Sequence, residues 1–233
     1  MTLVRARGVR KTFATFTAVD GVDLSVASGE VVGLLGANGA GKTTLMKMLL
    51  GLTTPTGGII ELFGGESPGR HARERIGYVP QGLGLYEDLT VGENLEFVAS
   101  AYGLELPPLG DLAAHRGLLV QDLSLGLRRR TAFLGALAHN PELLVLDEPT
   151  SGVDVLARSD LWGTIRTAAE SGAGVLVSTH HMEEADECDR LIVMAAGRVV
   201  LAGTMSEIIG DAVGGTKRIE SFEKRFAELV EAT

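Results

Sequence analysis

The strongest constraint on how this chain folds is a glycine-rich segment that joins an apolar run to a helical pattern. Residues 36–43 read G-A-N-G-A-G-K-T and match the spacing G-x-x-x-x-G-K-[ST], with the apolar run 31–35 before them and the helical pattern 44–50 after them. The glycines let successive backbone N–H groups turn inward around phosphate oxygens, and a helix that starts there adds its positive end. The alternative is an ordinary strand-to-helix turn with a solvated lysine, which this flanking pattern disfavours.

The side chains of this segment predict a site for phosphate groups and a magnesium ion. Lys42 has the length to reach the β- and γ-phosphates of a nucleotide, and the Thr43 hydroxyl can ligate Mg²⁺. The residues expected to contact the nucleotide here are Gly36, Asn38, Gly39, Ala40, Gly41, Lys42, Thr43 and Thr44.

Short runs rich in Val, Ile and Leu alternate with helical patterns along the chain, which is typical of an α/β fold with a largely buried sheet. Two early segments, 3–9 and 19–26, alternate more clearly between apolar and polar residues and predict an antiparallel β edge, so a mixed sheet is expected. The core strands are expected at 31–35, 76–79, 143–146, 175–178 and 191–194.

The strand pattern disappears between residues 90 and 139, which predicts an inserted helical subdomain. Thr90 and Glu93 have the spacing of a capping box that opens a helix through about residue 101. The segment 102–117 contains Pro107 and Pro108 and is expected to be a loop. The chain is therefore divided into a core of residues 1–89 and 140–205, the subdomain 90–139, and a C-terminal extension 206–233.

The extension carries a weaker helical pattern. Phe222, Phe226, Leu229 and Val230 fall on one face of a final helix.

Charge and cysteine content exclude several classes of protein. The 233 residues include 21 Lys and Arg against 30 Asp and Glu, and this net charge of −9 disfavours nucleic acid as a partner. Cys188 is the only cysteine, so it is expected to pack in the interior rather than form an internal disulfide or a cysteine-based zinc site. No run approaches the roughly 20 apolar residues that a membrane-spanning helix requires, so any role at a membrane is expected to need separate partners.

Ionisable residues follow two of the expected core strands. Asp147 and Glu148 follow the run 143–146, and His180 and His181 follow the run 175–178. The carboxyl ends of parallel strands are where such sheets bind their ligands. Asp147 suits the outer sphere of Mg²⁺, Glu148 suits a base that polarises an attacking water, and one histidine is expected to reach the γ-phosphate. The alternatives are solvated acids at a strand end and a chelating histidine pair, and the second is disfavoured because adjacent side chains diverge.

In this order, the motifs resemble those of the ATP-binding subunit of an ATP-binding cassette (ABC) transporter, over nearly the whole chain. The segment Y-V-P-Q places Gln81 at the family's Q-loop, and L-D-E-P-T-S-G-V-D contains the Walker B acids and a D-loop that ends at Asp154. The segment S-T-H-H-M-E-E-A makes His180 the switch histidine. Phe13, in R-K-T-F, matches the aromatic position at which the family stacks adenine, with a buried strand phenylalanine as the alternative.

The resemblance implies a fold, two cofactors and a set of roles. The fold is the P-loop NTPase core of the ABC ATPase type, with an antiparallel β edge and an inserted helical subdomain that is shorter than usual. The cofactors are ATP and Mg²⁺. Catalysis is assigned to Lys42, Glu148 and His180, and Mg²⁺ binding to Thr43, Gln81 and Asp147.

One motif departs from the family pattern. Where the family has a sequence close to L-S-G-G-Q, this chain has L-S-L-G-L, which keeps Ser124 and Gly126 but places Leu125 and Leu127 at the other two positions. In the family this segment closes on the ATP held by the other subunit of a dimer. The basic run 128–130 that follows is expected to form a solvated helix face, with a strengthened positive end of the helix as the alternative. The chain therefore resembles a cassette with a complete phosphate site and an altered signature.

These features predict the motor subunit of a membrane transporter, an exporter ATPase at the cytoplasmic face of the membrane. Its expected partners are a separate transmembrane permease subunit and a second cassette, identical or, as the altered signature favours, different. Two alternatives remain: an ATPase of the same superfamily that is not coupled to transport, as in iron-sulfur assembly, and a catalytically poor regulatory cassette.

Overall fold

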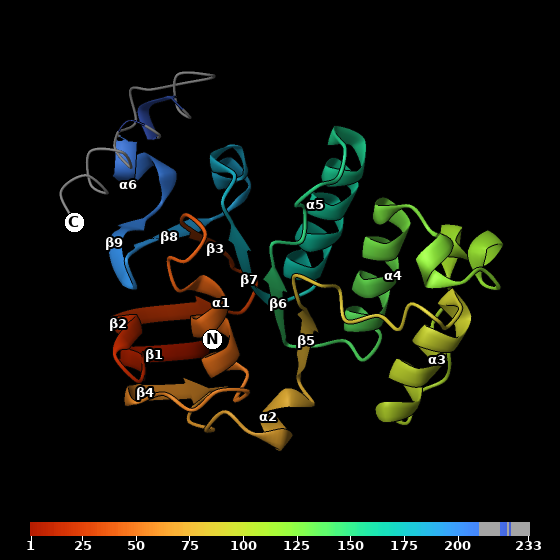
Figure 1. The fold of residues 1–233 in the computed structure, drawn as a ribbon, viewed down its shortest axis with the longest axis horizontal. Coiled ribbons are helices and arrows are strands. Elements are labelled where there is room, and N and C mark those ends of the chain that lie inside the picture. The colour runs from red at the N-terminus through yellow and green to blue at the C-terminus, as the bar shows by residue number, and fades with distance from the viewer. Residues whose placement is uncertain (210–219, 223, 225–233) are drawn as a thin grey trace.

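The computed structural model describes residues 1–209, 220–222 and 224 (Figure 1). Of the predicted final helix, Phe222 is described and buried, while Phe226, Leu229 and Val230 lie outside the described residues. Most of the predicted C-terminal extension therefore lies outside the described residues.

A six-stranded sheet forms the centre of the described chain, in the order β5-β6-β7-β3-β8-β9. All its neighbouring pairs are parallel except β8 with β9. Every residue of β3, β6 and β7 is buried, which explains why their sequences are continuous apolar runs. The five predicted core strands are confirmed within two residues at each end: β3 (Val31–Leu35), β5 (Ile76–Val79), β6 (Leu143–Asp147), β7 (Gly174–Thr179) and β8 (Arg190–Ala195), to which the structure adds β9 (Arg198–Gly203).

The predicted antiparallel strands are present, but they form a second sheet of their own. Here β1 (Thr2–Phe13) pairs with β2 (Phe16–Ala27) on one side and with β4 (Gly57–Leu62) on the other, both antiparallel. The antiparallel edge of the main sheet is β9 instead. The alternating burial along β1 and β2 reflects a sheet with one face in the core and one face in water.

Helix α1 (Lys42–Leu49) packs against strands of both sheets. It contacts β1 and β2 of the three-stranded sheet and β6 of the six-stranded sheet. Its side chains Leu45, Met46 and Met48 are fully buried in an apolar cluster that also includes residues of β1, β2 and β3. The start of α1 is thereby fixed at the carboxyl end of β3.

Helices α3 (Val91–Ala101) and α4 (Leu125–Leu137) form a lobe to one side of the main sheet (Figure 1). The predicted capping box is confirmed, since Glu93 N donates to Thr90 Oγ1 at 3.2 Å and Thr90 N donates to Glu93 Oε2 at 2.8 Å. The predicted loop 102–117 contains only one short 3₁₀ helix, Gly110–His115. The lobe has an apolar cluster of its own, formed by Val91, Leu95, Leu112, Val120 and Leu123.

The remaining helices cover the sheet or connect strands. Helix α5 (Val155–Glu170) packs against β7, and its side chains Leu161, Trp162 and Ile165 are buried. The short elements are α2 (Arg70–Arg73), α6 (Met205–Ile209) and the 3₁₀ helices Val120–Asp122 and Met182–Glu187. Among the described residues, no helix has both the length and the apolar character needed to cross a bilayer.

Candidate nucleotide site

The glycine-rich segment forms a tight loop between β3 and α1. Gly36 and Gly41 have φ angles of 152° and 102°, a region that residues with a Cβ rarely adopt. A Cβ at Gly36 would lie 2.3 Å from Met194 O, and one at Gly41 would lie 2.4 Å from Ala18 O. These two glycines let the loop backbone press against neighbouring strands. Between them, residues 37–39 remain exposed and available to a ligand.

Lys42 is the first residue of α1 and is almost completely buried. Its Nζ donates to Gly36 O at 2.7 Å and to Ala37 O at 3.3 Å, and it lies 3.6 Å from Glu148 Oε1. A buried ammonium group is costly unless acceptors surround it, and here they come from the loop and from a carboxylate. The side chains of Thr43 and Thr44 follow in the first turn of α1 and are half-buried.

Two carboxylates stand at the end of β6, where the sequence predicts them. Asp147 is 1% exposed, and its Oδ1 accepts a 2.6 Å hydrogen bond from Ser178 Oγ on the neighbouring strand β7. Its Oδ2 is buried and has no hydrogen-bond partner among the described residues. An unpaired buried carboxylate oxygen is unfavourable in isolation, so this atom is suited to a ligand that supplies positive charge.

Glu148 is the point at which the predicted catalytic residues meet. Its Oε1 faces Lys42, while its Oε2 lies 3.2 Å from His180 Nδ1 and accepts a 3.3 Å hydrogen bond from Gln81 Nε2. Gln81 follows β5 and His180 follows β7, so adjacent parallel strands deliver all of these side chains to one edge of the sheet. The structure thus brings together Lys42, Gln81, Asp147, Glu148 and His180.

A second group of predicted residues lies at the N-termini of α4 and α5. Ser124 caps α4 by accepting a 3.4 Å hydrogen bond from Leu127 N, and Asp154 caps α5 by accepting a 2.9 Å hydrogen bond from Ala157 N. The latter bond lowers the pKa of Asp154. The two helix starts are close, because a Cβ at Gly126 would lie 3.7 Å from the Ala157 Cβ. Ser124, Gly126 and Asp154 make no hydrogen bond or ion pair to the Glu148 cluster among the described contacts.

Phe13 lies at the tip of the hairpin between β1 and β2. It is 49% exposed, pairs in register with Phe16, and has Lys11 Nζ 4.9 Å from the centre of its ring. The exposure rules out the alternative of a buried strand phenylalanine. Further along β2, Ala18 and Val19 abut the phosphate loop at Gly41, so this hairpin adjoins the site.

Two residues with structural ties to Glu148 escaped prediction. Ser178, within the apolar strand β7, accepts a 3.0 Å hydrogen bond from Glu148 N while donating to Asp147. The signal for it was a small polar residue in an apolar run. Arg129 belongs to the basic run 128–130, for which a solvated helix face was predicted; that prediction is wrong for Arg129, which is 4% exposed and bonded to the segment after β6.

Cys188 confirms the packing role expected from the sequence. It is buried in the cluster that surrounds α5, and burial raises the pKa of its thiol far above the usual value. No group of three or more His, Cys, Asp or Glu side chains in the described part of the chain is arranged to hold a metal ion by itself.

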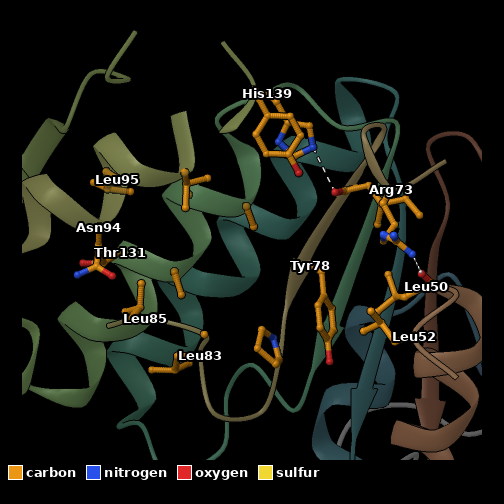
Figure 2. Close-up of a pocket in the computed structure, with 18 residues that line it drawn as sticks. Leu50, Leu52, Arg73, Tyr78, Leu83, Leu85, Asn94, Leu95, Thr131 and His139 are labelled. Atoms are coloured by element: carbon orange, nitrogen blue, oxygen red, sulfur yellow. Dashed lines mark hydrogen bonds between the residues drawn. The ribbon is translucent and has the colours of Figure 1, made fainter. Parts of the chain in front are cut away.

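An apolar groove separates the helical lobe from the core (Figure 2). It encloses about 350 Å³, and the Tyr102 and His139 rings stack on its wall with their centres 3.9 Å apart. Burial lowers the pKa of His139, whose Nε2 lies 3.2 Å from Ile76 O, and burial together with the charge of Asp147 raises the pKa of Tyr78 to about 12. The His139 imidazole and the Tyr78 phenol are therefore both neutral near pH 7. The lining of the groove includes Leu50, Leu52, Tyr78, Pro80, Leu83, Leu85, Val98, Tyr102 and His139.

The fold and the site together define a P-loop nucleotide-binding protein. The family model described as "ABC transporter" matches residues 19–151. The chain belongs to the ABC transporter family, as a nucleotide-binding domain.

Similar proteins support this assignment. The "Probable multidrug ABC transporter ATP-binding protein YbhF" of Escherichia coli (strain K12) is 38% identical over 245 residues, which cover 98% of this chain and 42% of that protein. The "Nod factor export ATP-binding protein I" of Burkholderia lata is 42% identical over 221 residues, 89% of this chain and 73% of that protein. This chain thus spans less than half of the first relative and about three quarters of the second.

Solved structures agree. A structure described as the ATP-binding subunit of an ABC transporter has a TM-score of 0.83 and 29% identity, covering 97% of this chain and 99% of that one. CbiO1 of Clostridium perfringens, described as part of an ABC transporter complex, has a TM-score of 0.79 and 25% identity, covering 99% and 98% of the two chains.

Phe13→Ala should weaken ATP binding by about 1 kcal/mol, or about fivefold in Kd, through the loss of one stacking contact. The melting temperature should change little, because the ring is half exposed. Isothermal titration calorimetry measures the affinity, and Phe13→Tyr should restore it. Phe16→Ala is the matched control. If Phe16→Ala weakens ATP binding and Phe13→Ala does not, the stacking role belongs to Phe16.

Proposed function

We propose that this chain is the ATP-hydrolysing motor subunit of a membrane ABC transporter and that it works in a dimer of cassettes. The observation that carries the proposal is the meeting of Lys42, Gln81 and His180 around the Glu148 carboxylate, beside an unpaired oxygen of Asp147. A buried carboxylate oxygen without a partner is unfavourable by itself, and here it belongs to the residue next to Glu148. This arrangement supports a site for a triphosphate, its metal ion and an attacking water.

The donor set fits Mg²⁺, which prefers oxygen ligands and keeps several waters. Asp147 offers its free Oδ2, directly or through a water, and Thr43 and Gln81 supply a hydroxyl and an amide oxygen. When bound, Mg²⁺ neutralises charge on the β- and γ-phosphate oxygens.

The side chains of the chain itself suggest a division of labour. Lys42 places a cation beside the phosphate loop, where it can exchange its loop carbonyls for phosphate oxygens. Glu148 accepts the proton of the attacking water, while Gln81 donates a hydrogen bond to its Oε2 and His180 lies beside the same oxygen. His180 can also reach the γ-phosphate, because it leaves the sheet beside the strand that leads into the phosphate loop.

The partner that we propose for the apolar groove is a cytoplasmic segment of a transmembrane permease subunit. One stretch of chain contacts both places: Pro80, Leu83 and Leu85 line the groove, and Gln81 between them bonds Glu148. A segment seated in the groove would therefore be sensitive to rearrangement at the nucleotide. With this partner, the chain would lie peripherally at the cytoplasmic face of a membrane.

We assign the transporter to the exporters, since the relatives at 38% to 42% identity are described as multidrug and Nod factor export proteins. The altered signature further favours a partner cassette different from this one. Leu125 is 39% exposed at the start of α4 and lies against Gly152, so it occupies the surface that the family turns toward the partner's ATP. Leu127 instead packs against the apolar cluster of the lobe. Of the two leucines, Leu125 is the one placed to weaken the partner's site.

Glu148→Gln should keep ATP affinity and lower kcat by about 10²- to 10⁴-fold, because an amide cannot accept the proton. Lys42→Ala should instead abolish ATP binding, which distinguishes a lost base from a lost phosphate contact. Phosphate release and calorimetry measure the two effects. Unchanged turnover in Glu148→Gln would contradict the base assignment.

Leu52→Glu should reduce the fraction of the chain that purifies with native membranes and with a polytopic membrane protein identified by mass spectrometry. Leu52 lines the groove and is 54% exposed, so the substitution adds charge there without disturbing the core. Ile59→Glu, at a similarly exposed aliphatic residue on β4, is the control and should leave recovery unchanged. Equal recovery of both variants would contradict the groove as the docking site.

Leu125→Gly should raise the turnover of the purified chain, because a homodimer would place the altered signature over both ATP molecules, and the bulk of Leu125 would keep the backbone donors of that segment away from the phosphate. Each donor that fails to reach such a site costs about a few kcal/mol of transition-state stabilisation. Leu118→Gly, at an exposed leucine elsewhere in the lobe, is the control. Phosphate release is the measurement. If the chain alone already matches the rate of its permease complex and Leu125→Gly changes nothing, the leucine is a tolerated variation.

A further inference from the structure

A buried arginine connects the helical lobe to the backbone beside the catalytic glutamate. Arg129 lies in the second turn of α4, one residue away from the partly exposed Arg128 and Arg130. Its Nη1 donates to Glu148 O at 3.1 Å and to Pro149 O, and its Nη2 donates to Ser151 O. One guanidinium group therefore joins three carbonyls of the segment that follows β6.

The partners of Arg129 show what the group does. Its terminal nitrogens donate to carbonyl oxygens, and no carboxylate pairs with it within ion-pair distance among the described residues. Burial lowers the pKa of Arg129, and the charges of Glu148 and Glu184 oppose that shift. A rigid planar fork buried against several carbonyls fixes peptide planes, which a flexible ammonium group cannot do equally well.

The backbone of Glu148 needs such a restraint. Its φ of 51° lies in the left-handed region, which a residue with a long side chain rarely adopts and which persists only where the surroundings enforce it. On one side, Glu148 N donates to Ser178 O at 3.2 Å and to Ser178 Oγ at 3.0 Å. On the other side, the Glu148 carbonyl is held by Arg129.

We propose that Arg129 is a positioning residue for Glu148, and that it sets the direction of the Glu148 carboxylate by holding the carbonyls of residues 148, 149 and 151 in place. The inference rests on the proposed function, because it gives Glu148 the role of base. With the left-handed backbone clamped from both sides, the side chain points toward Lys42, Gln81 and His180. Without Arg129 the peptide planes relax and the carboxylate leaves that position.

The test compares Arg129→Lys with Arg130→Met in the full chain. Lysine keeps the charge but loses the fork, so kcat should fall by about ten- to a hundredfold while KM for ATP stays within about twofold. Arg130 pairs with the exposed carboxylates of Asp111 and Asp160, and its removal should leave both constants unchanged. Arg129→Gln, whose amide can donate to one carbonyl, is measured as well in case the lysine variant does not fold.

A double-mutant cycle separates positioning from general loosening of the fold. In the Glu148→Gln background, Arg129→Lys should lower the residual rate less than about twofold, since no base remains to be positioned. A full further loss in that background, a loss of ATP affinity equal to the loss of kcat, or a folded Arg129→Lys variant with the kcat of Arg130→Met would each overturn the proposal. If the wild-type chain, alone and with its permease, hydrolyses ATP no faster than Glu148→Gln, the proposed function is contradicted, and so is the role of Arg129 that rests on it. If wild-type turnover is normal and Arg129→Lys does not change kcat, only the positioning role of Arg129 is contradicted.

Discussion

The nearly complete burial of Lys42, Asp147 and Glu148 at one edge of the sheet is the constraint on which the rest of this structure depends. Charged groups removed from water destabilise a fold unless acceptors, donors or opposite charges surround them. Here the compensation comes from the phosphate loop, from Ser178 and from the strand ends that carry Gln81 and His180. The parallel order of β5, β6, β7 and β3 brings these groups within reach of one another.

The sequence was informative where burial leaves a one-dimensional pattern. Strands covered on both faces are continuous apolar runs, so β3, β5, β6, β7 and β8 were predictable, and the residues that follow β3, β5, β6 and β7 form the candidate site. The second sheet was harder. Its third strand, β4, is only partly buried, and the pairing of β1 with β4 joins segments separated by all of β2, β3 and α1. The same partial burial concealed β9 at the edge of the main sheet. The sequence of a single strand does not show whether that strand forms the edge of the main sheet or belongs to a separate sheet.

The three consecutive arginines show most clearly what a one-dimensional burial pattern does not determine. Residues 128–130 present the same chemistry in the sequence, yet helical geometry sends them in three directions. Arg128 bonds carbonyls within the lobe, Arg130 pairs with exposed carboxylates, and Arg129 enters the interior beside Glu148. Which one would be buried depends on the angle at which α4 packs against the segment after β6, and that angle is a tertiary property. The two leucines of the altered signature diverge for the same reason.

Helix α4 consequently connects two parts of the molecule to which we assign different ATP molecules. Its N-cap, Ser124, belongs to the segment that faces the partner cassette in the family that this chain resembles. Arg129, little more than one turn later, holds the backbone of this chain's own Glu148. A helix is stiff over such a short distance, so a movement of its first turn is transmitted to the guanidinium group. Closure of a dimer around this chain's signature would then also affect Glu148, the residue that we propose as its base. The same helix lines the apolar groove, so a permease segment bound there would also contact α4 and could shift Arg129 through it.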